Sequence, residues 1–233
     1  MSSEWNNFQP HILQLEKEGK VTRTFRRLDP ERQQAVINAI LEEATERGPA
    51  SLNIKEIARR AGVAVGSLYQ YFPNRDGLLD FAIELCVRHT TDLFQQFRPM
   101  LASMPLRDAL SAYLMGGMEW GQTEMGLVRF FGRAAYQGDP DLAERVVRPI
   151  ATVMRETLQE IFSQAQARGE IPHSANLGET TRIANALIIA VGDSQLFPYL
   201  NSYFQITDES VSSEKIMTAL VEFILRGIGA GAG

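Results

Sequence analysis

Residues 53–79 read NIKEIARRAGVAVGSLYQYFPNRDGLL, and this stretch decides the fold. Asn53 predicts a helix N-cap, and Glu56 stands three residues later, at the spacing of a capping box. Apolar residues follow at helical intervals, and Gly62 allows the positive φ of a tight turn after a helix. A second short helix with a polar outer side is predicted from about Val65 to Tyr71. Two helices joined by a glycine turn are typical of a helix-turn-helix that reads DNA.

The same block resembles the DNA-binding domain of the tetracycline-repressor (TetR) family of bacterial regulators. Asn53 replaces the usual Thr or Ser, while Ala64 and Arg75 are less common residues that the family's pattern also allows; all three keep the capping or charge function. The positions that match, in order and without a gap, are Ile54, Lys55, Ile57, Ala58, Ala61, Gly62, Val63, Ala64, Gly66, Ser67, Leu68, Tyr69, Tyr71, Phe72, Arg75, Leu78 and Leu79.

The resemblance implies that the second helix and its neighbours contact DNA. Gln70 is the candidate for a base-edge contact because its amide can pair bidentately with adenine, and Lys55 would reach a guanine or a phosphate. Arg59 and Arg60 are expected on a solvated face, and packing against the first helix is the alternative role for Tyr71. Ser67, Tyr69, Tyr71 and Arg75 suit contacts with phosphates. The complete predicted set is Lys55, Val65 (to a thymine methyl), Gly66, Ser67, Tyr69, Gln70, Tyr71 and Arg75.

Composition is that of an ordinary soluble protein: 233 residues, 45% hydrophobic, 22% charged and a net charge of −5. The lone Cys86 excludes an internal disulfide and fits a reducing compartment. The first ten residues lack the pattern of a secretory leader, and the longest apolar run, 186–192, is too short to span a bilayer. A cytoplasmic protein that does not enter a membrane is therefore expected.

The charges are unevenly spread along the chain. Residues 20–75 hold ten Lys or Arg and six Asp or Glu, whereas residues 76–233 hold twelve and nineteen. A basic segment joined to an acidic body favours a DNA reader with a separate regulatory part.

Residues 1–28 form an extension before the helix-turn-helix block, with a short helix expected around Ile12 and Leu15. Four basic residues, Lys20, Arg23, Arg26 and Arg27, surround Phe25. Two interpretations stay open: a flexible basic arm along phosphates or in a minor groove, or a solvated tail whose Phe25 packs on the first helix.

Helical patterns continue to the end of the chain, so the predicted fold is all-α. A first core helix should run from Asp29-Pro30 to Gly48-Pro49, and a long helix from Asn74 to about Arg98, with His89 on its apolar stripe as a buried residue or, alternatively, a ligand contact. Further helices are expected at about 105–123, 126–137, 140–168 (kinked at Pro149), 176–200 and 212–228. The predicted domains are 1–28 (extension), 29–75 (DNA-binding) and 76–233 (ligand-binding and dimerisation).

The last two long helices carry nearly continuous apolar surfaces, which belong in a core or a helix–helix interface. The resemblance implies that they pair with a second copy as a four-helix bundle, which would place two reading helices on the half-sites of a palindromic DNA operator. The predicted interface residues are Ile183, Leu187, Val191, Ile216, Leu220, Phe223 and Ile224.

The resemblance also places an effector pocket among the helices of residues 105–200. Methionine and aromatic groups suit an adaptable apolar cavity, although core packing is the alternative for each of them. Asp193 interrupts an apolar seam, either as a ligand anchor or as an interface ion-pair partner. The candidates are Met115, Met118, Trp120, Gln122, Phe130, Arg133, Tyr136, Met154 and Asp193.

No catalytic constellation stands out, because the histidines (His11, His89 and His173) are scattered in the sequence and no metal-ligand spacing or phosphate loop occurs. We therefore predict no enzyme, no cofactor and no metal. The favoured function is a homodimeric repressor released from DNA by a small, mainly apolar effector. The alternative is a regulator without a ligand, controlled by a protein partner or by its own abundance.

Overall fold

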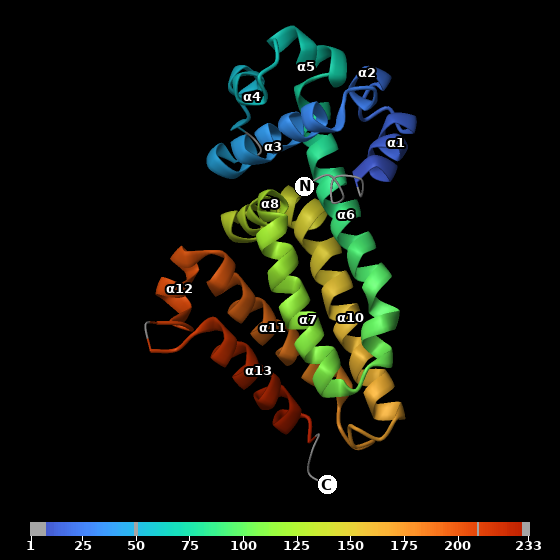
Figure 1. Ribbon diagram of the computed structural model, residues 1–233, viewed down its shortest axis with the longest axis vertical. Helices are drawn as coiled ribbons and strands as arrows, with labels where there is room; N and C mark the ends of the chain where they lie inside the picture. The colour runs from blue at the N-terminus through green and yellow to red at the C-terminus, as the bar shows by residue number, and fades with distance from the viewer. Residues whose placement is uncertain (1–7, 49–50, 209, 230–233) are drawn as a thin grey trace. The chain divides into compact units, whose positions relative to one another are not determined.

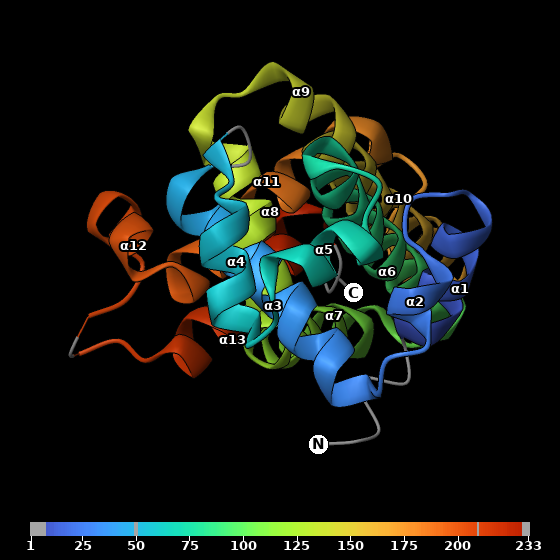
Figure 2. The same cartoon turned by 90° about the horizontal axis from the view of Figure 1, so that it is seen from above.

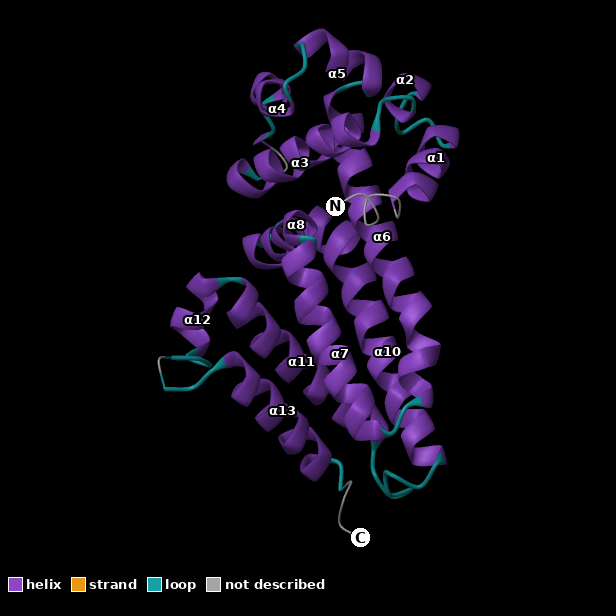
Figure 3. Cartoon of the chain, in the orientation of Figure 1, coloured by secondary structure: helices purple, strands orange, loops and turns teal. Residues whose placement is uncertain are grey.

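The computed structural model describes residues 8–48, 51–208 and 210–229, and the regular structure of these residues is entirely helical (Figure 3). This confirms the predicted all-α fold. Predictions that fall on the first seven residues, on Pro49 and on residues 230–233 lie outside the described part of the chain.

The chain divides into two compact units. The first comprises Met1–Asp92 and Met125–Ile150, and the second comprises Leu93–Glu124 and Ala151–Gly233. These units are defined by compactness and not by function. They therefore do not test the division predicted after residue 75 between a DNA-binding and a regulatory domain, which stays a prediction.

The first unit contains the helix-turn-helix. In Figures 1 and 2, α4 and α5 lie on one side of α3, and α4 packs closely against both α3 and α5. Buried residues such as Ile40, Ile57, Leu68 and Phe72 form this core. Its helices are α1 (Gln9–Lys17), α2 (Arg23–Arg26), α3 (Pro30–Arg47), α4 (Ile54–Ala61), α5 (Val65–Tyr71), the first part of α6 (Arg75–Ser103), α8 (Met125–Gln137), α9 (Pro140–Leu142) and the π-helix η3 (Ala143–Val147).

The second unit is built around a separate apolar core. Leu110, Phe162, Ile188 and Ile224 are among its buried side chains, each from a different helix. Its elements are the end of α6, α7 (Leu106–Thr123), most of α10 (Arg148–Ala167), α11 (Leu177–Leu196), α12 (Pro198–Phe204) and α13 (Ser213–Gly227).

The predicted end of the long helix at Arg98 is wrong, because α6 continues through Pro99 to Ser103. Leu101 and Ala102, in the additional turn, are buried in the core of the second unit. The guanidinium of Arg168 donates to the carbonyl of Ala102 at 2.8 Å, which satisfies an acceptor at the helix end. Packing and this cap outweigh the backbone hydrogen bond that proline removes.

The predicted helix 176–200 is also wrong in its length, since α11 ends at Leu196 and α12 begins at Pro198. Phe197 between them is extended, with φ −124° and ψ 92°, as expected for a residue that precedes proline. Around Pro149 the disturbance is a π-helical turn, η3, directly before α10, which accommodates the missing N–H.

Candidate nucleic-acid interface

The turn between α4 and α5 is closed by backbone hydrogen bonds. Gly62 has a left-handed φ of 66°, and the Val63 N–H donates to the Ala58 carbonyl at 3.0 Å. This is the Schellman arrangement, in which a residue at positive φ terminates the helix. A Cβ on Gly62 would meet no atom within 4 Å, so the backbone conformation and not the space favours glycine there.

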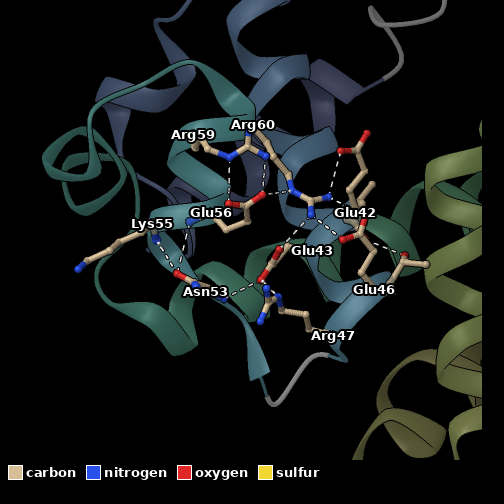
Figure 4. Close-up of polar contacts among 11 residues, drawn as sticks. Glu42, Glu43, Glu46, Arg47, Asn53, Lys55, Glu56, Arg59 and Arg60 are labelled. Carbon is tan, nitrogen blue, oxygen red and sulfur yellow. Dashed lines mark hydrogen bonds and ion pairs between the residues drawn. The ribbon is translucent and has the colours of Figure 1, made fainter.

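The cap at the start of α4 differs in part from the predicted capping box. The Asn53 side chain accepts from the N–H groups of Lys55 (3.1 Å) and Glu56 (3.4 Å), as predicted. The Asn53 N–H, however, donates to Oε1 of Glu43 on α3 at 3.2 Å, and the Glu56 carboxylate binds arginines instead (Figure 4). The second half of the cap therefore ties α4 to α3.

Two adjacent arginines on α4 have different environments (Figure 4). Arg59 is 70% exposed and pairs with Glu56, as predicted for a solvated face. Arg60 is only 17% exposed, so the prediction of a solvated side chain is wrong for it. Hydrogen bonds from both guanidiniums lower the pKa of Glu56 to about 2, and the carboxylates around Arg60 raise its pKa. The groups around Arg60 are Glu42 (3.5 Å), Glu43 (3.5 Å), Glu46 (2.5 Å) and Glu56 (3.1 Å).

The outer side of α5 is open to solvent. Gly66, Tyr69 and Gln70 are exposed on it, and so are Lys55 on α4 and Arg75 at the start of α6. Val65 and Ser67 are half-buried, while Leu68 is buried against the core. Six of the eight predicted DNA contacts thus belong to the exposed or half-buried surface of the α4–α5 block, and Arg75 follows it directly.

Tyr71 lies elsewhere, in an aromatic cluster. Its side chain is 7% exposed, and its ring lies 5.8 Å from that of Phe25, edge to face. Phe25 also contacts Phe72 (5.5 Å) and Phe81 (5.4 Å), which come from the end of α5 and from α6. Packing is therefore the main role of Tyr71, although its partner is the N-terminal extension rather than the first core helix.

The basic segment of the extension is folded and not a flexible arm. Phe25 is fully buried within α2, Lys20 pairs with Asp80 at 3.6 Å, and Arg26 pairs with Glu16. Arg23 and Arg27 are exposed and stay candidates for contact with DNA.

Thr22, a residue that the sequence analysis did not single out, fastens this segment to α5. Its hydroxyl donates to the Gln70 carbonyl at 2.6 Å, and its N–H donates to the Tyr71 carbonyl at 2.9 Å. The last carbonyls of a helix lack partners within the helix, and Thr22 provides the hydrogen-bond donors for those of Gln70 and Tyr71.

The extension also binds α6 along its length. Arg88 pairs with Glu18 at 2.6 Å, and this hydrogen bond lowers the pKa of Glu18 to about 2. His89 is buried, as predicted, with its ring stacked 4.2 Å from that of Phe8, and burial lowers its pKa to about 4. The structure brings His11 within 5.7 Å of His89, although the two residues are far apart in the sequence.

The predicted pocket residues do not form one described group. Phe130, Arg133 and Tyr136 belong to the first unit, and the other candidates belong to the second. Phe130 is fully buried, so it is a core residue. Met115, Gln122 and Tyr136 are exposed, whereas Met118, Trp120, Arg133, Met154 and Asp193 are half-buried.

The predicted interface residues fall into two groups. Val191, Leu220 and Ile224 are buried in the chain's own core, which leaves little of them for a second copy. Ile183 on α11 and Phe223 on α13 are each 63% exposed, and Leu187 and Ile216 are partly buried beside the core.

Neither a metal site nor a reactive thiol is indicated. Within the described residues, no three His, Cys, Asp or Glu side chains are grouped as metal ligands. Burial raises the pKa of the Cys86 thiol to about 12, which keeps it protonated. Among the helices described, none has the length and apolar character required to cross a bilayer.

Comparison with known proteins agrees with this geometry. Residues 36–81 match the family model described as bacterial regulatory proteins, tetR family. The chain is 29% identical over 150 residues to the HTH-type transcriptional regulator BetI of Stenotrophomonas maltophilia, a match that covers 63% of this chain and 72% of the relative. It spans about half the length of another relative with this name, from Yersinia pestis, with 48% covered.

Two solved structures share the fold. The regulator FadR from Bacillus subtilis, in complex with stearoyl-CoA, superposes with a TM-score of 0.54 at 19% identity, covering 85% of this chain and 98% of FadR. The SmeT–triclosan complex superposes with a TM-score of 0.63 at 15% identity, covering 85% of this chain and 91% of SmeT. Because the matched segment coincides with the helices that build the helix-turn-helix, residues 36–81 form a DNA-binding domain of the TetR family, and the chain is related to the transcriptional regulators of that family.

Proposed function

We propose that this protein is a homodimeric repressor that binds a palindromic DNA operator and is released from it by a small, mainly apolar effector. The observation that carries the DNA-binding part is the exposed outer side of α5, where Gln70 follows Tyr69 on a helix whose C-terminal end is held by Thr22. Gln70 would contact a base edge, while Lys55, Tyr69 and Arg75 would contact phosphates.

Dimerisation is supported by the apolar groups that the single chain leaves exposed. Ile183 and Phe223 project from α11 and α13, two helices that contact each other. Large exposed apolar side chains on adjacent helices are typical of an interface. A two-fold pair would place two copies of α5 about 34–36 Å apart, one turn of DNA.

The effector part of the proposal is supported by the solved neighbours, of which one was determined with stearoyl-CoA and another with triclosan. Residues 76–233 would hold the effector and α6 would carry the signal, because α6 runs from the helix-turn-helix unit into the second unit. An effector that favours one of two arrangements of α6 changes DNA affinity by its differential binding to them.

A gel-shift titration with the DNA upstream of the protein's own gene tests the proposal. Gln70→Ala should weaken discrimination at one base pair by about 1–3 kcal/mol, whereas Gln164→Ala, at an exposed glutamine of α10, should leave binding unchanged. Equal loss on all sequences would contradict the base contact. No binding at low salt would exclude the function, and binding that no small molecule relieves would favour control by a protein partner or by abundance.

A further inference from the structure

The buried polar atoms that lack a hydrogen-bond partner are concentrated on two helices of the second unit. Six such side-chain atoms occur within the described residues, and one of them, Oε2 of Glu43, lies 3.5 Å from a guanidinium nitrogen of Arg60. The other five are all on α7 or α11, and we name this group the α7–α11 seam: Tyr113 Oη and Trp120 Nε1 on α7, and Thr181 Oγ1, Asn185 Oδ1 and Gln195 Nε2 on α11.

Leaving these atoms without partners would cost a large part of the protein's stability. One buried polar group without a partner lowers the folding equilibrium constant about tenfold. Five of them would lower it by about five powers of ten, which approaches the whole folding equilibrium constant of a marginally stable domain. Such groups are paired in native proteins, so either ordered water or a bound molecule must pair them.

The two helices are neighbours, and the seam residues recur on one side of each. Tyr113 and Trp120 are seven residues apart on α7, and Thr181 and Asn185 are four apart on α11, the spacings that share a helix face. A Cβ added at Gly192, which has the same helical phase on α11 and is half-buried, would meet no atom within 4 Å. The seam therefore joins unpaired polar atoms to a half-buried position with free space.

The chemistry of the seam defines what it can hold. Indole Nε1–H of Trp120 only donates, so the ligand must present an acceptor there. Burial raises the pKa of Tyr113, whose phenol stays neutral and can donate to a second acceptor. The seam atoms belong to uncharged side chains, so an anionic group would be buried there without a counter-charge from them. The ring of Phe94, 6.1 Å from that of Tyr113, and the surrounding core provide an apolar wall.

We propose that the α7–α11 seam binds a neutral, amphipathic small molecule with at least two hydrogen-bond acceptors, and that this molecule is the effector. This inference rests on the proposed function for the existence of an effector, and it adds the polarity and the residues that recognise it. Neutral hydrogen bonding to a buried ligand would select against charged acyl compounds of similar apolar size.

Fluorescence of Trp120 provides a readout that requires no DNA. The chain has two tryptophans, so Trp5→Phe makes the emission report Trp120 alone. Triclosan, a largely uncharged phenol with hydroxyl and ether oxygens, is the probe, and stearoyl-CoA is the anionic comparison. We expect saturable quenching or a spectral shift with triclosan and at least tenfold weaker binding of stearoyl-CoA.

Tyr113→Phe and Thr181→Val remove only the unpaired hydroxyls. Both variants should bind triclosan about threefold to tenfold more weakly, and both should have a higher urea midpoint than the parent protein without a ligand. Tyr199→Phe, at an exposed tyrosine of α12, is the matched control and should change neither quantity.

The outcomes separate the possibilities. Unchanged triclosan binding in both variants, no binding of triclosan, or tighter binding of stearoyl-CoA would each overturn the proposed ligand class. Variants that are less stable without a ligand would overturn it too, because they would mean that ordered water already pairs the hydroxyls. If the parent protein without a ligand does not bind DNA in a parallel gel shift, the proposed function is excluded. The measurement of triclosan binding at the seam would remain valid in that case.

Discussion

Replacing Glu43 by glutamine tests whether a buried ion pair holds α4 against α3. The Glu43 side chain has 0% of its surface exposed, and it is surrounded by three donors on residues from two helices and the loop between them. Its Oε1 accepts from Asn53 N–H (3.2 Å) and lies 3.1 Å from Arg47 Nε, while Oε2 lies 3.5 Å from Arg60 Nη2 (Figure 4). Glutamine keeps the size and one acceptor but removes the charge.

The magnitude follows from this environment. Breaking a buried ion pair by removing one partner costs about 3–5 kcal/mol, and the retained amide oxygen, which can still accept from Asn53, favours the lower end, about 3 kcal/mol. With a urea dependence of about 1–3 kcal/mol per molar, the unfolding midpoint of the helix-turn-helix unit should fall by about 1–3 M.

The assay is urea unfolding of the full chain followed by far-UV circular dichroism. Glu46→Gln is the matched control, because Glu46 contacts the same Arg60 guanidinium at 2.5 Å but is 57% exposed. Exposed ion pairs contribute little, so the control should unfold at the parent midpoint. Equal shifts in the two variants, or an unchanged midpoint for Glu43→Gln, would refute the reasoning that burial makes this pair important.

Three further substitutions probe other parts of the helix-turn-helix unit. Thr22→Val should lower the free energy of unfolding by about 1–2 kcal/mol and weaken specific DNA binding, because the Gln70 carbonyl loses its donor; unaltered affinity would mean that the end of α5 holds without it. Gly66→Ala should raise stability by about 1 kcal/mol, since its Cβ meets no atom within 4 Å, yet weaken binding to all DNA if the backbone approaches a phosphate, and unchanged gel shifts would exclude that approach. His89 has a pKa lowered from 6.5 to about 4, so the unfolded chain takes up a proton first and stability falls as the pH decreases from 6.5 towards 4. His89→Phe should reduce this slope in urea midpoints, with His11 accounting for the remainder, and an identical slope would contradict the assignment.

The helix boundaries that depend on local chemistry could be predicted from the sequence. Asp29 and Asn53 each accept backbone N–H groups at the helix starts predicted for them, and Asp139 does so directly before the start predicted at residue 140, because a capping side chain acts within three residues of its own position. Gly62 terminates α4 for the same kind of local reason. The exposed side of α5 follows from the helical period once these ends are fixed.

The two prolines show why other boundaries could not be predicted. Pro198 begins a new helix, as its local preference dictates, whereas Pro99 lies inside α6. The difference comes from distant partners. Arg98, before Pro99, pairs with Glu156 on α10 at 3.3 Å, and the Arg168 guanidinium donates a hydrogen bond to the Ala102 carbonyl at the end of α6. A sequence pattern contains no information about which residues of a remote helix will be adjacent.

The same limit explains why the residues that orient α5 were missed. Its N-terminal side follows α4, which Glu43 and Arg60 fasten to α3, and its C-terminal carbonyls are held by Thr22 from a segment 48 residues earlier. None of these three side chains belongs to the exposed outer side of α5, yet we expect them to influence the angle at which Gln70 is presented, because they hold α4 and the end of α5. A contact with a base edge tolerates little displacement, so specificity should depend on them as well as on Gln70. Loss of sequence preference without loss of non-specific affinity is therefore the signature expected when either attachment of α5 is weakened.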